Sequence, residues 1–239
     1  MKDRLPIANG LSPVNIIYED NHLLVVEKPV NIPSQEDETR DPDMLTILKS
    51  YIKEKYNKPG EVFLGLVHRL DRPVGGAMVF ARTSKAASRL SEQIRSREFK
   101  KVYLAVVNGI PAKKQGRLQH YLYKDERTNT VRVVDADYPG AKEAILEYTT
   151  LESQEGLSLV RIQLHTGRPH QIRVQFANVG NPLFGDQKYG AGINRAGQQI
   201  ALWSNRITLV HPTMKEERVF ECQPPQSFPW NSFKIVFNV

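Results

Sequence analysis

Cysteine is nearly absent from this sequence, with Cys222 the single example in 239 residues. One thiol excludes an intramolecular disulfide and any zinc site built from several cysteines. Its neighbours Val219 and Phe220 are apolar, which favours a small buried side chain over a nucleophile. No stretch approaches the ~20 apolar residues that a membrane-spanning helix requires, and the first ten residues lack the apolar core of a secretory signal. We therefore expect a cytoplasmic protein with no membrane association.

Acidic residues are scarce in the middle of the chain. Residues 82–132 contain thirteen lysines and arginines against four acidic residues, a net charge of +9 that exceeds the +7 of the whole sequence. Such a concentration of positive charge predicts a polyanionic partner whose binding weakens as salt is added. A solvated basic face is the alternative interpretation. Three tyrosines among these charges, Tyr103, Tyr121 and Tyr123, favour the binding surface.

Hydrophobic residues make up 40% of the sequence, enough to bury a sizeable core. Alternation of apolar residues predicts strands, and apolar residues spaced by three and four predict helices. The expected strands are 15–18, 23–27, 77–81, 99–107, 116–122, 130–134, 143–151 and 157–165. Helices are expected from Asp41-Pro42 to Tyr56, from Thr83 or Ser84 onward, and from Pro169 to just before Gly180. Because the links between the later strands are too short for helical crossovers, we expect an α+β fold with a mostly antiparallel mixed β-sheet and flanking helices.

The stretch from residue 68 to 76 holds the candidate reactive group. It reads His68-Arg69-Leu70-Asp71-Arg72-Pro73-Val74-Gly75-Gly76 and leads into the apolar run at 77–81. Positive charge beside a carboxylate favours its ionised form, and glycines allow close approach of backbone or ligand. Asp71 is therefore the candidate reactive carboxylate. A structural ion pair between Asp71 and an arginine is the alternative, and this stretch alone does not decide between the two.

The same stretch resembles the signature of RluA-type RNA pseudouridine synthases, in which His-Arg-Leu-Asp is followed by a basic residue, a variable residue and Thr-Ser-Gly. Val74 and Gly75 stand here in place of the usual Thr and Ser. Five further segments resemble the family in the same order along the chain. They are 19–29 (EDNHLLVVEKP), 101–103 (KVY), 164–173 (LHTGRPHQIR), 185–190 (GDQKYG) and 209–212 (LVHP). The resemblance implies a catalytic domain over residues 15–239, preceded by an N-terminal segment, 1–14, too short for the added RNA-binding domain of some relatives.

The resemblance implies roles for three residues in converting uridine to pseudouridine. Asp71 matches the catalytic carboxylate and Arg173 the arginine that pairs with it, since a bidentate guanidinium keeps a carboxylate charged and oriented. Tyr103 matches the tyrosine that contacts the target base and helps to remove its carbon-5 proton. Without the resemblance, Arg173 would be interpreted as an exposed helical arginine and Tyr103 as a core residue of a strand.

The resemblance also implies that the partner is RNA, ribosomal or transfer, bound in a basic cleft. Arg69 matches the arginine that fills the gap left by the flipped uridine. In the basic segment we expect phosphate contacts from Arg95, Arg97, Lys100 and Lys101. The isomerisation needs no redox agent, so no cofactor and no metal are expected. Nothing in the sequence indicates an obligate protein partner.

Two other functional classes fit part of the sequence. A relative that binds RNA without catalysis would explain the two departures from the signature, although all three catalytic candidates are retained. A metal-dependent phosphoesterase would use His68 and Asp71 and would lose activity with a chelator, which pseudouridine synthesis would not. The spacing of His165 and His170 differs from the i, i+4 pair of helical zinc motifs, and no cysteine or acidic residue completes that pair.

Overall fold

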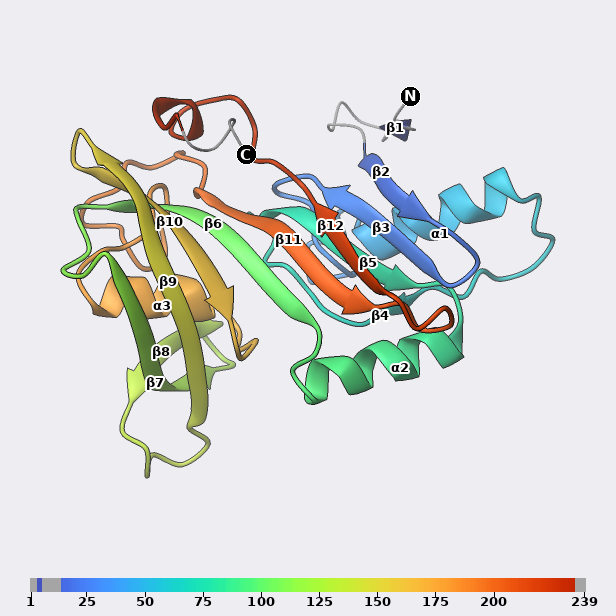
Figure 1. The fold of residues 1–239 in the computed structure, drawn as a ribbon, viewed down its shortest axis with the longest axis horizontal. Helices are drawn as coiled ribbons and strands as arrows, with labels where there is room; N and C mark the ends of the chain where they lie inside the picture. Colours follow the sequence, from blue (N-terminus) through green and yellow to red (C-terminus); the bar gives the residue numbers. More distant parts are fainter. Residues whose placement is uncertain (1–3, 6–13, 235–239) are drawn as a thin grey trace. The chain divides into compact units, whose positions relative to one another are not determined.

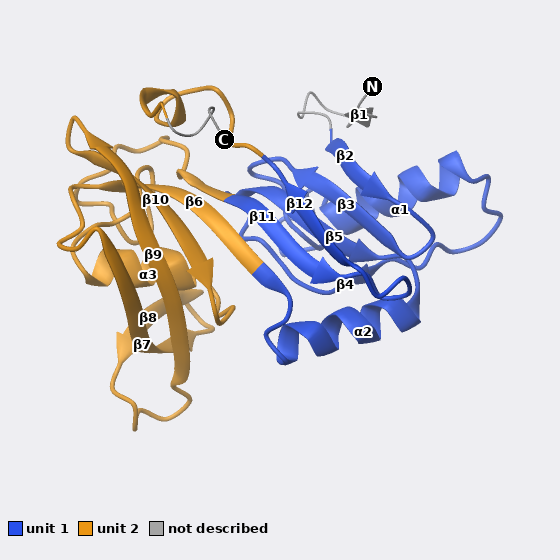
Figure 2. Ribbon diagram, in the orientation of Figure 1, with its two compact units in different colours: residues 1–100, 204–222 blue, residues 101–203, 223–239 orange. Residues whose placement is uncertain are grey.

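The computed structural model describes residues 4–5 and 14–234, which form two compact units (Figures 1 and 2). Unit 1 comprises the chain up to residue 100 together with 204–222, and unit 2 comprises 101–203 and the part from residue 223 onward. The predicted N-terminal segment, residues 1–14, lies almost entirely outside the described residues. No helix in the described part of the chain is long and apolar enough to cross a membrane.

Unit 1, blue in Figure 2, is built on β-strands from distant parts of the sequence. In order, its main strands are β1 (Arg4–Leu5), β2 (Val14–Glu19), β3 (Leu23–Lys28), β5 (Gly75–Ala81) and β11 (Leu202–Val210), of which the part from Ser204 belongs to this unit. Two shorter strands extend the sheet, β4 (Gly65–Leu66) beside β5 and β12 (Glu217–Glu221) beside β11. Every residue of β5 is buried, so this strand forms the centre of the unit's core.

Helix α1 (Met44–Lys55) buries one apolar face and begins after Asp43. The Asp43 carboxylate accepts hydrogen bonds from the backbone N–H groups of Leu45 (2.9 Å) and Thr46 (3.1 Å). The prediction that Asp41 caps this helix and Pro42 opens it was therefore wrong. A capping side chain must reach the amides two and three residues ahead, and Asp43 is the residue that does so.

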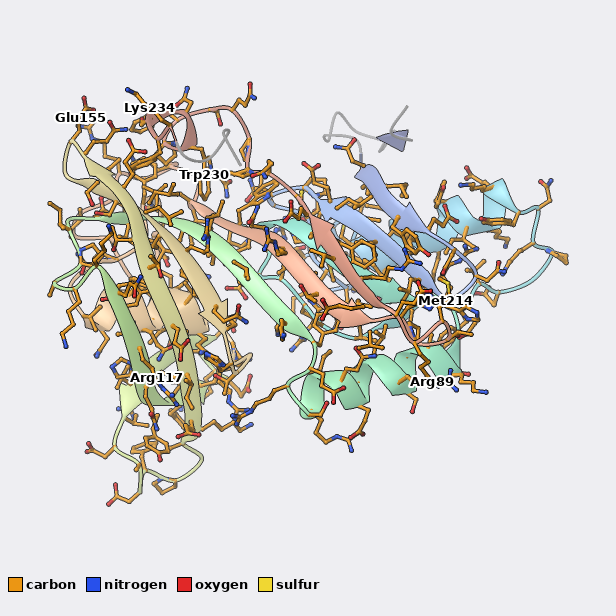
Figure 3. The ribbon with its side chains drawn as sticks, in the orientation of Figure 1. Arg89, Arg117, Glu155, Met214, Trp230 and Lys234 are labelled. Atoms are coloured by element: carbon orange, nitrogen blue, oxygen red, sulfur yellow. The ribbon has the colours of Figure 1, made fainter. Side chains whose placement is uncertain are left out.

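Helix α2 (Ser84–Arg95) begins where predicted, because the Thr83 hydroxyl caps its first turn. The buried side-chain amide of Gln93 donates to the Val210 carbonyl (2.8 Å) and accepts from the Val210 N–H (2.9 Å). Arg89, labelled in Figure 3, donates to the Pro212 carbonyl at 2.5 Å. These bonds fix α2 against the end of β11.

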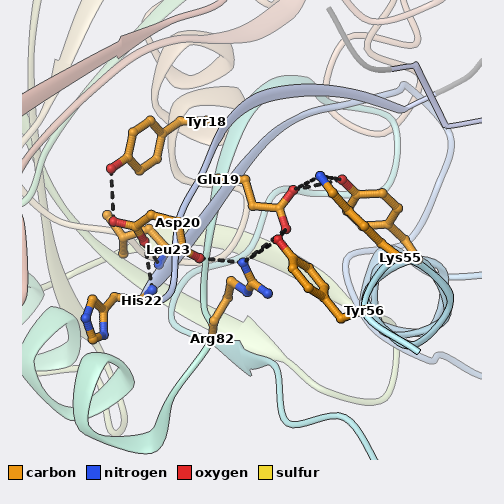
Figure 4. A network of polar contacts seen from close by, with 9 residues as sticks. Tyr18, Glu19, Asp20, His22, Leu23, Lys55, Tyr56 and Arg82 are labelled. Atoms are coloured by element: carbon orange, nitrogen blue, oxygen red, sulfur yellow. Dashed lines mark hydrogen bonds and ion pairs between the residues drawn. The ribbon is translucent and has the colours of Figure 1, made fainter. Parts of the chain in front are cut away.

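A buried carboxylate, Glu19 at the end of β2, joins α1 to the sheet (Figure 4). Its oxygens accept hydrogen bonds from Tyr51 (2.7 Å), Lys55 (2.8 Å), Tyr56 (2.8 Å) and Arg82 (3.0 Å). Burial by itself would raise the pKa of Glu19, but the hydrogen bonds and the charge of Lys55 outweigh it, so the pKa lies below its usual value. Glu19 therefore stabilises the fold in its ionised form.

We expect Glu19→Gln to lower the free energy of unfolding by about 2 kcal/mol at neutral pH, because it removes charge-assisted hydrogen bonds. Since the folded pKa lies below the ordinary value of ~4.3, the contribution is complete above that value and is lost as pH falls through the folded pKa. Urea unfolding of wild type and variant at neutral and acidic pH measures this difference. Glu54→Gln, at an exposed position of α1, is the matched control. If Glu19→Gln lowered the free energy of unfolding by the same amount at both pH values, this account would be contradicted.

Unit 2, orange in Figure 2, contains a second group of antiparallel strands. In order they are β6 (Lys100–Asn108, from Lys101 in this unit), β10 (Leu157–Leu164), β9 (Lys142–Gln154), β7 (Gln115–Asp125) and β8 (Thr130–Val134). Each neighbouring pair runs antiparallel. The predicted α+β class with a mostly antiparallel sheet is confirmed.

Helix α3 (Gln171–Asn178) lies on the same face of this sheet as Tyr103. Tyr103, Ile162 and Tyr148 are directly opposite one another on β6, β10 and β9, so their side chains share a face. The ring of Phe176, in α3, contacts the Tyr148 ring at a centroid distance of 5.4 Å. The pairing of the strands therefore places α3 over the Tyr103 face.

The start of α3 differs from the prediction, whereas its end agrees. His170 has a left-handed backbone with φ 51°, so the helix begins at Gln171 and Pro169 lies before it. A proline suits the first helical position. Pro169 does not occupy it, because the left-handed residue His170 lies between Pro169 and the helix. Gly180, with φ 83°, follows the end of the helix as expected.

Candidate active site

Asp71 lies in the turn that leads into β5. The backbone N–H of Val74 donates to the Asp71 carbonyl at 2.9 Å and closes this turn. Leu70 and Val74 are 5% and 2% exposed, whereas Asp71 between them is only partly buried. The apolar neighbours therefore hold the turn in the core while Asp71 keeps access to solvent.

Lys28, at the end of β3, fixes the same turn. Lys28 is fully buried, and its ammonium donates hydrogen bonds to the carbonyls of Pro29 (2.9 Å), Ile32 (2.5 Å) and Arg72 (3.1 Å). Burial lowers the pKa of Lys28 to about 7, the charge of Asp71 opposes that shift, and the charge of Arg72 adds to it. Lys28 thus holds the backbone of the turn by hydrogen bonds, and its charge interacts with that of Asp71.

Two further contacts hold the backbone on either side of Asp71. The buried Ser34 hydroxyl donates to the Leu70 carbonyl (2.8 Å) and accepts from the Leu70 N–H (3.2 Å). A Cβ at Gly76 would lie 2.3 Å from the Ser204 carbonyl oxygen, and Gly76 has φ 112°, so only glycine fits there. The expected close approach of backbone at the glycine pair is confirmed at Gly76.

The two arginines that flank Asp71 in the sequence have different surroundings. Arg72 forms an ion pair with Asp41 and donates to the Thr39 hydroxyl at 2.9 Å. Its charge is therefore shared with the acidic loop before α1. Arg69 is exposed.

Arg173 of α3 is held by Asp186. The guanidinium donates through Nε to Oδ2 (2.8 Å) and through Nη2 to Oδ1 (2.9 Å), and the two side chains are 8% and 0% exposed. Burial would raise the pKa of Asp186, but the hydrogen bonds and charge of Arg173, with the N–H groups of Lys188 and Tyr189, lower it. This bidentate pair fixes the edge of the guanidinium that carries Nε and Nη2, so Nη1 lies on the opposite edge, away from Asp186.

Two histidines of the sequence motifs, His68 and His170, form hydrogen bonds within their own units. His68 accepts a hydrogen bond from the Val79 N–H at 3.0 Å. The Tyr189 hydroxyl accepts from the Val131 N–H (2.9 Å) and forms a second hydrogen bond with His170 Nδ1 at 2.6 Å. Tyr189 also stacks on Arg173, with the guanidinium carbon 5.2 Å from the ring centroid.

Lys101 shares the Tyr103 face of the unit 2 sheet. The two residues are two positions apart on β6, which pairs with β10 in an unbroken register, so their side chains point the same way. Tyr103 is 6% exposed and Lys101 is partly buried. Arg173 lies in α3 on this same face, so the structure brings these three predicted residues together on one side of one sheet.

The predicted site residues divide between the two units. Those of unit 1 are Arg69, Asp71, Arg95, Arg97 and Lys100, and those of unit 2 are Lys101, Tyr103 and Arg173. Sequence reasoning assigned no role to Lys28, Ser34 or Asp186, which hold the candidate residues in place. A lysine that ends an apolar strand and an aspartate directly after a glycine were the available signals.

A sequence profile described as RNA pseudouridylate synthase matches residues 22–178. The chain is 36% identical over 215 residues to the "uncharacterized RNA pseudouridine synthase YhcT" of Bacillus subtilis (strain 168), covering 89% of this chain and 69% of that protein. It is 35% identical over 232 residues to "ribosomal large subunit pseudouridine synthase D" of Haemophilus influenzae, covering 90% and 69%. "Human RNA Pseudouridylate Synthase Domain Containing 4" has the same fold, with a TM-score of 0.73, 24% identity and 88% of each chain covered. On the profile and these identities, the chain belongs to the RNA pseudouridylate synthase family.

Proposed function

We propose that this enzyme isomerises a uridine in ribosomal or transfer RNA with Asp71 as the catalytic carboxylate and without a cofactor. The observation that carries the assignment of Asp71 is the anchoring of its turn. Lys28, Ser34 and the close approach at Gly76 hold the backbone on both sides, while Asp71 stays partly exposed. A reacting group needs this kind of pre-organisation.

The chemistry assigns each candidate residue a task. Breaking the bond between N1 of uracil and C1′ of ribose requires an electron pair from Asp71 at the nucleotide, or removal of the 2′ proton by Asp71. We propose, as the resemblance to the family implies, that Arg173, which Asp186 orients, pairs with the Asp71 carboxylate and keeps it ionised. Tyr103 stacks on the base and helps to remove its carbon-5 proton after C5 bonds to C1′. We propose that residues 15–239 form the catalytic domain that carries these groups.

A protein that only binds RNA is the second candidate function, suggested by Val74 and Gly75 at positions usually held by Thr and Ser. Both residues are buried, and Gly75 opens the fully buried strand β5. They therefore serve the packing of unit 1, and this placement favours the catalytic function.

In this proposal, Arg69 and other basic side chains of unit 1 supply the affinity for RNA. Replacing three exposed residues by glutamine is expected to weaken RNA binding and to flatten its dependence on salt, by about 0.7–0.9 in logarithmic slope for each phosphate that the variant no longer neutralises. The three are Arg95, Arg97 and Lys100. The matched control removes three exposed charges elsewhere in unit 1, at Lys53, Lys58 and Lys215. Fluorescence anisotropy across a salt series measures both sets, and equal slopes would place the RNA elsewhere.

The RNA and the uridine are identified by mapping pseudouridines across the transcriptome of cells with and without the gene. Three relatives are named for the large ribosomal subunit, so we expect ribosomal RNA to lose at least one site on deletion and to regain it with the wild-type gene. We propose the cytoplasm as the location, since assembling ribosomes offer this substrate there. An unchanged map in both ribosomal and transfer RNA would contradict the proposed substrate.

A further inference from the structure

Lys101 differs from the other basic residues predicted to bind RNA. Arg95, Arg97 and Lys100 are exposed, whereas Lys101 is partly buried. Within the part of the chain that the structure describes, its ammonium has no hydrogen-bond or ion-pair partner. A partly buried ammonium without a protein partner has lost some of its water and gained no protein contact in exchange, which is unfavourable for the fold.

The position of Lys101 is built into the sheet and the loop that follows β10. Lys101 is opposite Leu164, and its ammonium reaches the loop at residues 165–168. A Cβ at Gly167 would lie 3.1 Å from Lys101 Nζ, so the glycine leaves room for the ammonium. This loop leads directly into α3, which carries Arg173.

The same geometry places Lys101 beside the proposed base-binding residue. Tyr103 lies two residues further along β6 on the same face, about 7 Å away along the strand at ~3.3 Å per residue. A uracil stacked on Tyr103 would therefore have its edge within reach of a lysine side chain. Burial lowers the pKa of Lys101, which makes its ammonium a better proton donor to an oxygen that gains negative charge.

Cleavage of the glycosidic bond creates such an oxygen. Both electrons of the N1–C1′ bond stay with uracil, and the resulting anion spreads its charge over N1, O2 and O4. At the sugar, C1′ gains a bond to the Asp71 carboxylate, or C2′ loses a proton. When C5 bonds to C1′, the carboxylate leaves or C2′ regains its proton. The C5 proton then departs and N1 takes up one proton, so the reaction is a net isomerisation.

We propose that Lys101 is a further catalytic residue, whose ammonium donates a hydrogen bond to a carbonyl oxygen of the detached uracil and stabilises its negative charge. This inference rests on the proposed function and adds a group that acts on the base, whereas Asp71 acts at the nucleotide and Arg173 on Asp71. A pre-organised donor aimed at developing charge is worth about 100- to 1000-fold in rate. The uracil oxygen of the substrate would thus be the hydrogen-bond acceptor for the Lys101 ammonium.

Three variants test the proposal by single-turnover pseudouridine formation with saturating RNA. Lys101→Met keeps the length and apolar body of the side chain without the charge, and should slow the reaction about 100-fold or more. RNA affinity should stay within about threefold, and the thermal unfolding midpoint should not fall, since the charge that is removed is partly buried and forms no ion pair in the described residues. Lys113→Met, at an exposed position of unit 2, removes the same charge and should react at the wild-type rate.

Lys101→Arg separates charge from shape. If the wild-type rate falls at alkaline pH because Lys101 loses its proton, that fall should be absent in Lys101→Arg, since a guanidinium stays charged to pH ~12. A Lys101→Met variant with wild-type rate but weaker, less salt-dependent binding would make Lys101 a phosphate-binding residue and overturn the proposal. A slow Lys101→Met variant with identical pH profiles for wild type and Lys101→Arg would overturn it as well. A wild-type protein that forms no pseudouridine would overturn the proposed function itself.

Discussion

Asp71→Asn is expected to abolish pseudouridine formation while RNA affinity stays within about tenfold of wild type, or ~1.4 kcal/mol. The amide keeps the shape of the carboxylate but carries no negative charge, so it neither attacks the nucleotide nor takes a ribose proton. The turn itself should persist, because Lys28 and Ser34 bind backbone groups that the substitution leaves in place. Nuclease digestion and mass spectrometry of the RNA measure the product, and fluorescence anisotropy measures binding.

The control for this variant is Asp37→Asn, which removes a charge near the same turn. Asp37 lies in the acidic loop before α1 and is 3.7 Å from Arg72 across an exposed ion pair. Exposed pairs of this kind contribute little to stability, so activity should remain within a few-fold of wild type. Normal turnover by a verified Asp71→Asn preparation would remove Asp71 from the proposed centre.

Asp186→Asn is expected to destabilise the protein by about 3 kcal/mol or more, because it removes the bidentate carboxylate from a buried ion pair with Arg173. The substitution also releases the edge of Arg173 that Asp186 orients through Nε and Nη2. Pseudouridine formation should therefore fall at temperatures where the variant is still folded. Urea unfolding measures the stability, and product formation well below the unfolding midpoint measures the activity.

The effect of Asp186 should also depend on pH in a defined direction. Because its folded pKa is lowered, its stabilisation is present above the ordinary aspartate pKa of ~3.9 and is lost as pH falls through the folded value. The gap between wild type and Asp186→Asn should narrow in acid. Asp137→Asn, an exposed position in the turn after β8, should match wild type throughout. A variant as stable and active as wild type would show that Arg173 does not depend on Asp186.

Local patterns predicted the strands and helices well wherever side-chain periodicity decided them. The Thr83 cap is an example, since its hydroxyl reaches an amide only three residues away. The start of α3 was wrong because the backbone of His170 is left-handed, and no spacing of apolar residues encodes that conformation. Strands β11 and β12 were not predicted, and their pairing joins the segment after residue 204 to β5, far away in the sequence.

By itself, the sequence determined the α+β class, the basic middle segment and the motifs that indicate an RNA pseudouridine synthase, because each depends on residue types at short spacing. The tertiary structure alone decided which groups meet. Lys28 binds the carbonyl of Arg72, and Asp186 binds Arg173. In neither pair are the two residues neighbours in the sequence. The position of Lys101 beside Gly167 likewise follows from the pairing of β6 with β10. Hydrogen-bond partners distant in sequence depend on strand order and register, which local propensity does not specify.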